Sequence, residues 1–371
     1  MIKKISIKNF KCFDSFEAEG FSRINLIGGM NNVGKTALLE ALMIFQDEIF
    51  AWKKIQTMYD VKGLTYPAPA PELLWFPLYH NFRIDESIKI KADLNLLVIE
   101  YIQNDNPEMY TPPVNQLVNN LITAGSSETA GSYFGGKNGI NEKLHFNLLK
   151  GNDTFHWCYT INQNPNNHWA VTDTYYPLMN SSVKAPESVY ITSASRINEA
   201  VVSNWFGEID KSKKADKVVE YLKLIEPRIA SLNSIHSGGL PVVHCDIGLS
   251  EKLPLALLGS GTMRLLEILL GIIMCKDKVV FVDEIENGFH HSVQSKIWES
   301  IARACQDYNV QLFATTHSYE LLSKSILGAK NAGMADEFRY IRLEKINDRI
   351  EPIVFDHELL KGSLESNFEV R

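Results

Sequence analysis

The stretch Gly29-Met30-Asn31-Asn32-Val33-Gly34-Lys35-Thr36 decides the fold, because it fits the phosphate-binding loop pattern G-x-x-x-x-G-K-[ST]. An apolar run over residues 24–27 precedes the loop and predicts a buried strand, and residues 37–42 predict a helix after it. The glycines let the backbone curl so that its amides face phosphate oxygens, and the helix N-terminus adds partial positive charge. Strand, loop and helix together predict a nucleotide site.

Individual side chains of the loop have separate expected roles. Lys35 is expected to reach the β- and γ-phosphates, and the Thr36 hydroxyl is expected to ligate Mg²⁺. The residues predicted to bind the phosphates of the nucleotide are Gly29, Asn31, Asn32, Val33, Gly34, Lys35, Thr36 and Ala37.

A second apolar stretch supplies carboxylates for the same site. Val279-Val280-Phe281-Val282-Asp283-Glu284 is typical of a strand in the middle of a parallel sheet, covered on both faces and ending in two acids. Asp283 is expected to hold the magnesium ion, directly or through water, and Glu284 to orient and deprotonate the attacking water. The plainer alternative is that the two acids cap the following helix.

Residues 311–318 predict another buried strand, with His317 at its end. We expect the imidazole to donate to the γ-phosphate, since it comes one helix and one strand after the acid pair. A purely structural histidine is the alternative.

Residues 258–264 place a serine and two glycines at the start of an apolar helix that is expected to run over residues 265–274. Such a helix end is a second anion-binding site. Because the chain already has one phosphate loop, this end is expected to serve the nucleotide of a neighbouring copy. An ordinary helix cap is the alternative.

The rest of the chain is interpreted from its periodicity. Ile88, Ile90, Ala92, Leu94, Leu96 and Val98 are expected to share one face of a single strand. Other expected elements are a strand and turn over residues 5–16, a first helix that runs to about Phe50, a hairpin over 144–161, a strand at 189–192, a helix at 215–226, and strands at 338–343 and 349–355.

The composition bounds the class of protein. The chain has 371 residues, of which 45% are hydrophobic, and a formal net charge of −7. This charge argues against a surface coated in positive charge for nucleic acid, although it leaves room for a local basic groove. The five cysteines form no C-x-x-C pair, and no apolar leader or long apolar span occurs. A soluble, cytoplasmic protein without membrane contact is expected.

Taken together, the motifs resemble an ABC-type ATPase head of the SMC, Rad50 and RecF kind, and most of all the prokaryotic AAA15-family ATPases close to the OLD-family ATPase domain. The resemblance is carried by residues 7–13, 29–36, 193–198, 258–264, 283–290 and 314–318, which occur in the order of the family. The signature reads Leu-Gly-Ser-Gly-Thr rather than Leu-Ser-Gly-Gly-Gln, and the glutamine loop has only a weak candidate near Ser193.

The resemblance implies an α/β fold, with a mostly parallel phosphate-loop sheet flanked by helices, an N-terminal antiparallel β portion and a helical lobe. Residues 1–50 and 186–371 would form the composite head, and 51–185 a β-rich, family-variable insertion. The resemblance also implies that Lys11 lies near the phosphates, and that Ser260 and Gly261 complete the site of a partner copy. Asn287 and Gly288 would lie at the dimer interface, and His317 would be the switch histidine.

The implied function is a switch that sandwiches ATP and Mg²⁺ between two protomers of a homodimer or higher homo-oligomer. It would control a separate effector, such as a Toprim-like or HNH nuclease in anti-phage defence, because no Toprim acidic pattern follows His317. The alternative is a RecF-like repair or recombination ATPase that binds DNA directly.

Overall fold

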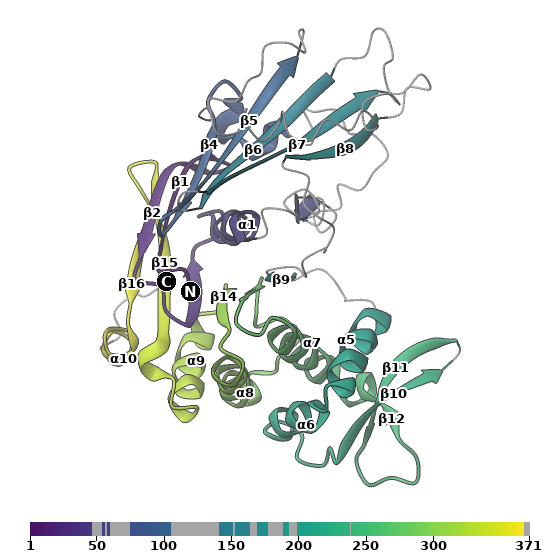
Figure 1. Cartoon of the computed structure of the whole chain (residues 1–371). Coiled ribbons are helices and arrows are strands. Elements are labelled where there is room, and N and C mark those ends of the chain that lie inside the picture. Colours follow the sequence, from purple (N-terminus) through teal and green to yellow (C-terminus); the bar gives the residue numbers. More distant parts are fainter. Residues whose placement is uncertain are drawn as a thin grey trace.

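The computed structural model describes residues 1–46, 54–55, 58–59, 75–104, 141–150, 153–163, 169–176, 188–192, 199–237 and 239–366. These residues form three sheets and the helices around them (Figure 1). The stretch 193–198, the Phe50 end of the first helix and most of the loops in the predicted insertion lie outside the described residues.

The central sheet has six strands in the order β16-β15-β3-β14-β13-β9. Five of them run parallel, and β16 pairs antiparallel with β15. The strands are β3 (Ile24–Gly29), β9 (Ser188–Ile191), β13 (Val279–Val282), β14 (Gln311–Thr315), β15 (Phe338–Ile346) and β16 (Arg349–Phe355). The predicted mostly parallel sheet is therefore confirmed.

Both faces of this sheet are covered, as the apolar runs indicate. All four residues of β13 are buried. Val280 and Val282 belong to one hydrophobic core, which includes residues of the C-terminal helices, whereas Val279 and Phe281 belong to a second core that includes the helix after the phosphate loop. Alternate side chains of one strand thus serve two cores.

The helices are α1 (Lys35–Gln46), α5 (Glu199–Lys211), α6 (Ala215–Lys223), α7 (Ser260–Met274), α8 (Gln294–Asp307), α9 (Tyr319–Asn331) and α10 (His357–Glu365). Short 3₁₀ turns are η2 (Phe76–Leu78), η3 (His80–Phe82), η4 (Leu255–Leu258), η5 (His291–Val293) and η6 (Ala335–Glu337). In Figure 1, α1 lies between the central sheet and the large antiparallel sheet, while α5 to α9 lie on the opposite side of the central sheet.

A lobe formed by α5, α6 and α7 carries a small antiparallel sheet, which the sequence analysis did not anticipate. Its strands are β10 (Ser231–Ser237), β11 (Leu240–Asp246) and β12 (Leu253–Pro254). The strands β10 and β11 pair from Ser231 with Asp246 to Ser237 with Leu240. The predicted helical lobe is present, with this sheet at its edge.

The N-terminal antiparallel portion is a seven-stranded sheet in the order β2-β1-β4-β5-β6-β7-β8. Its strands are β1 (Lys4–Phe10), β2 (Phe13–Glu19), β4 (Ile88–Ala92), β5 (Asn95–Asn104), β6 (Asn141–Lys150), β7 (Asp153–Gln163) and β8 (Trp169–Tyr176). Strands from the predicted insertion therefore extend a sheet that β1 and β2 begin. The boundary between head and insertion stays a prediction.

The predicted single strand over residues 88–98 is wrong. The chain turns after Ala92, where Asp93 has a φ of +51°, and Leu94 is 89% exposed at the turn. On the return strand the buried positions are Leu97 and Ile99. The alternating apolar pattern continued through the turn, so the sequence period alone did not reveal that the chain reverses there.

The other predicted elements are confirmed to within a few residues. The hairpin of β6 and β7, the strand β9 and the strands β15 and β16 all occur at the expected positions. The helix predicted at 215–226 ends earlier, since α6 stops at Lys223.

Candidate functional site

The phosphate loop, the acid pair and His317 meet at one edge of the central sheet. The loop follows β3, Asp283 and Glu284 follow β13, and His317 comes two residues after β14, which lies between these strands. They surround a cavity of about 1020 Å³. Carboxyl ends of neighbouring parallel strands are where such sheets bind ligands.

Lys35 is held by its own loop. Its Nζ donates to the carbonyl oxygens of Gly29 and Met30, each at 2.8 Å. Burial lowers the pKa of Lys35, and the nearby carboxylate of Asp283 opposes this shift. The ammonium group therefore lies against the backbone of the loop, near the first residues of α1.

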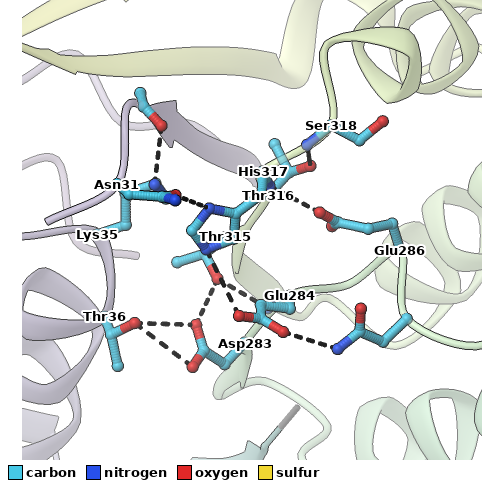
Figure 2. A network of polar contacts seen from close by, with 12 residues as sticks. Asn31, Lys35, Thr36, Asp283, Glu284, Glu286, Thr315, Thr316, His317 and Ser318 are labelled. Atoms are coloured by element: carbon cyan, nitrogen blue, oxygen red, sulfur yellow. Dashed lines mark hydrogen bonds and ion pairs between the residues drawn. The ribbon is translucent and has the colours of Figure 1, made fainter. Parts of the chain in front are cut away.

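Thr36 and Asp283 face each other across the site (Figure 2). The Thr36 hydroxyl lies 3.4 and 3.5 Å from the two carboxylate oxygens of Asp283. Burial raises the pKa of Asp283, while the hydrogen bond from Thr315 lowers it. A buried carboxylate beside a hydroxyl is an all-oxygen donor set, and it fits Mg²⁺.

Glu284 has a φ of +46°, an uncommon conformation for a residue with a Cβ atom. Its Oε2 accepts a hydrogen bond from Asn287 Nδ2 at 2.7 Å, and its Oε1 lies 3.5 Å from His317 Nε2. The other ring nitrogen of His317 lies 2.8 Å from Asn31 Oδ1. A continuous polar network thus joins the phosphate loop, the histidine and the acid (Figure 2).

Lys11 lines the same cavity but forms an ion pair with Glu40 on α1. The Glu40 side chain is 2% exposed, and Lys11 has a φ of +49°. The lysine is thus near the loop, as the resemblance implies, and its partner here is a carboxylate of the chain itself.

The residues expected to complete the site of a partner copy, Ser260 and Gly261, lie outside this cavity. Ser260 begins α7 and is exposed, and neither Ser260 nor Gly261 is among the described residues that line the cavity. Gly261 packs against the segment after β13, because a Cβ atom on Gly261 would lie 2.8 Å from the Gly288 carbonyl oxygen. Ser260 and Gly261 are therefore not part of the described lining of the cavity in their own copy.

Most of the predicted site residues come together. Those that line the cavity are Lys11, Asn31, Asn32, Gly34, Lys35, Thr36, Ala37, Asp283, Glu284 and His317. Gly29 and Val33 are not among its lining residues: Gly29 contributes its carbonyl to Lys35, and the Val33 side chain belongs to the core around α1.

The sequence analysis gave several lining residues no place in this cavity, although it expected Asn287 at a dimer interface. The cavity is also lined by Cys12, Glu40, Met58, Tyr190, Glu286 and Asn287. Tyr190 lies on β9, next to β13, and hydrogen-bonds Asp283; burial is the main cause of its raised pKa. Helix periodicity could have indicated Glu40. It comes four residues after Thr36 on α1, and residues four apart lie on the same face of a helix.

Comparison with known proteins gives matches over most of the chain. Residues 1–322 match the family model described as AAA ATPase domain. A Helicobacter pylori protein named ATP/GTP phosphatase is 23% identical over 346 residues, which are 87% of this chain and 86% of that protein. An uncharacterized protein of Methanocaldococcus jannaschii is 44% identical over 45 residues, or 12% of this chain.

Solved SMC head structures also match. One bound to the C-winged helix domain of ScpA has a TM-score of 0.46 at 13% identity, covering 96% of this chain and 98% of that one. The SMC head domain from Thermotoga maritima has a TM-score of 0.42 at 11% identity, covering 96% of this chain and 99% of that one.

None of the helices in the described part of the chain has the length and apolarity needed to span a bilayer.

Proposed function

The chain belongs to the AAA ATPase domain family and is an ATPase, and we propose that it works as a switch in which two copies enclose each ATP with its Mg²⁺. The observation that carries the proposal is the meeting of Lys35, Asp283, Glu284 and His317 on one cavity. These residues come from three separate segments of the chain, and each has the chemistry that one part of phosphoryl transfer to water requires.

The proposed mechanism assigns one task to each group. Lys35 exchanges its two loop carbonyls for phosphate oxygens, as a charged donor favours an anionic acceptor. Thr36 and Asp283 would hold Mg²⁺, and the ion would neutralise part of the phosphate charge when bound. Glu284 accepts the proton of the attacking water, and His317 donates to the γ-phosphate.

The network around Glu284 supports this assignment. Asn287 and His317 both lie against its carboxylate, so two neighbours restrict its orientation. A general base needs such a fixed direction toward the water it deprotonates.

The proposal of a dimer is supported by the position of α7. Its N-terminus is exposed, and its N-cap residue is Gly259, which has no side chain to cap the first amides of the helix. Backbone amides of such a helix end are available for an anion. In the proposed closed form, Ser260 and Gly261 of one copy contact the nucleotide held by the other, which makes closure dependent on ATP.

The proposed partner is a separate effector, a nuclease of the Toprim-like or HNH kind in anti-phage defence. This part of the proposal rests on the family resemblance of the motifs, and co-purification from the native host tests it. The alternative is direct DNA binding as in RecF. It predicts affinity that falls steeply with salt, and the net charge of −7 weighs against it.

The experiment is the variant Glu284→Gln. The amide keeps a hydrogen-bond acceptor for Asn287 but no longer takes up a proton, so we expect ATP turnover to fall at least about a hundredfold while ATP binding persists. Turnover is measured as released phosphate, and binding by titration calorimetry. Size-exclusion chromatography with ATP is expected to give a dimer.

The matched control is Glu351→Gln on β16, an exposed glutamate that does not line the cavity. It should retain the turnover of the parent protein. Undiminished hydrolysis by Glu284→Gln would contradict the assignment of the general base, and efficient turnover by a strictly monomeric protein would contradict the switch.

A further inference from the structure

Thr315 is the last residue of β14, between the phosphate-loop strand and the strand that carries the acid pair. It is fully buried and follows the last ladder pair of β13 and β14, Val282 with Ala314. On its other side it pairs with Ile27 of β3, two residues before Gly29. The residue is thus the structural link between the two halves of the site.

A single hydroxyl contacts both acidic residues (Figure 2). Thr315 Oγ1 donates to Asp283 Oδ1 and accepts the backbone N–H of Glu284 at 2.8 Å. The Thr315 carbonyl oxygen also accepts the N–H of Ile285 at 3.0 Å. Three consecutive residues, 283 to 285, are therefore held by one threonine.

The two hydroxyl bonds act on different properties of the acids. The bond to Asp283 fixes the direction of the carboxylate that faces Thr36. The bond from the Glu284 amide satisfies a backbone donor in a residue at φ +46°, where the conformation itself is unfavourable. Without the hydroxyl, the main-chain bond from Ile285 would remain, but the Asp283 carboxylate and the Glu284 amide would each lose one hydrogen-bond partner.

We propose that Thr315 is a positioning residue, whose hydroxyl sets the carboxylate of Asp283 for Mg²⁺ and the backbone of Glu284 for the attacking water. The inference rests on the proposed roles of those two acids and adds a third residue to them. Thr315 does not line the cavity, so it acts through its neighbours.

The test compares Thr315→Val, which has nearly the same shape without the hydroxyl, with Thr315→Ser, which keeps it. For Thr315→Val we expect kcat to fall about tenfold or more and the Mg²⁺ concentration that half-saturates ATP binding to rise about tenfold, since a hydrogen bond to a charged group is lost. ATP affinity in EDTA should stay within about twofold, because the phosphate loop keeps its donors. Thr315→Ser should stay within about threefold of the parent in both properties.

The neighbouring residue gives a matched control. Thr316 is also buried, but its hydroxyl accepts the N–H of Ser318 at 3.0 Å. Thr316→Val should therefore leave the Mg²⁺ dependence of ATP binding unchanged. Thermal melting of all three variants measures the structural cost separately.

Two results would overturn the inference. One is parent-like Mg²⁺ dependence and kcat in Thr315→Val, and the other is equal impairment of the Ser and Val variants in EDTA and Mg²⁺ alike, which would mark a merely structural role. If the parent protein hydrolyses no ATP, the proposed function fails, whereas Mg²⁺-dependent binding still tests Thr315.

Discussion

Like Gly29, Gly34 occupies a position of the phosphate loop where backbone and neighbours both require glycine. Its φ is +89°, and a Cβ atom on it would lie 2.7 Å from the Cys12 sulfur and 3.0 Å from the Phe13 ring. The first feature disfavours any other residue. The second shows that the β1–β2 turn closes directly over the loop, so the N-terminal sheet shapes the site.

We therefore expect Gly34→Ala to weaken ATP binding by about tenfold or more, because the loop must shift to relieve the contact with Cys12. Titration calorimetry measures the affinity, and thermal melting measures the accompanying loss of stability.

Gly248→Ala is the matched control for Gly34→Ala. Gly248 has a similar φ of +83°, but a Cβ atom there meets nothing within 4 Å. It carries only the backbone cost of about 1 to 2 kcal/mol and should leave ATP affinity unchanged. Equal loss of affinity in both variants would show that the contact with Cys12 is unimportant.

At the scale of elements, two helical glycines differ in what surrounds them. Gly207 in α5 has nothing within 4 Å of the position of a Cβ atom, whereas Gly328 in α9 would place one 2.5 Å from Trp298 Cβ on α8. The first is a weak point of its helix. The second allows α8 and α9 to approach closely.

Gly207→Ala should raise the free energy of unfolding by about 0.5 to 1 kcal/mol, because alanine restricts the unfolded chain and favours the helix. Gly328→Ala should lower it by more than that, since the two helices must separate. Urea denaturation of the two variants measures both effects. A stabilised Gly328→Ala would mean that α8 and α9 adjust without cost.

The strands over residues 88–99 show how sequence periodicity can mislead. Ile88, Ile90 and Ala92 are buried as the alternation predicts. The alternation then continues through Leu94, but Asp93 and Leu94 form the turn. The next buried residue is Leu97, one position after the Leu96 that the alternation predicts. An alternation with a period of two does not show where a chain reverses. The tertiary pairing of β4 with β5 therefore decided which residues of the return strand are buried.

At the scale of the whole molecule, the proposed composite site has two halves. One is the exposed N-terminus of α7 of one copy, and the other is the cavity around Lys35 and Asp283 of its partner copy. In a twofold-symmetric dimer each copy gives its Ser260 to the other. Ser260→Arg should therefore abolish turnover while ATP binding by each copy stays nearly intact. Released phosphate and calorimetry measure the two properties.

Mixing Ser260→Arg with Glu284→Gln tests the geometry. A mixed dimer regains one site with an intact acid from the first variant and an intact Ser260 from the second, so an equal mixture should recover about a quarter of the parent turnover if copies pair at random. Ser323→Arg, on the exposed side of α9, is the control expected to keep full turnover. No recovery on mixing would contradict a site shared between copies.

The sequence by itself was enough to predict the phosphate loop, the acid pair and the strands that carry them. Lys35, Thr36, Asp283 and Glu284 could be predicted because the loop pattern and the apolar strands are local: each needs only a few neighbouring residues to form. The parallel sheet followed from the same apolar runs, which suit strands buried on both faces.

Only the tertiary structure decided which distant residues complete the site. Glu40 and Tyr190 lie in no motif, and the motif stretch 314–318 does not indicate what the Thr315 hydroxyl contacts. Their roles arise because α1, β9 and β14 bring them beside the loop and the acids. The small sheet of β10 to β12 likewise has no strong local pattern. Contacts between residues far apart in the chain depend on how the elements pack, and local propensity does not encode that packing.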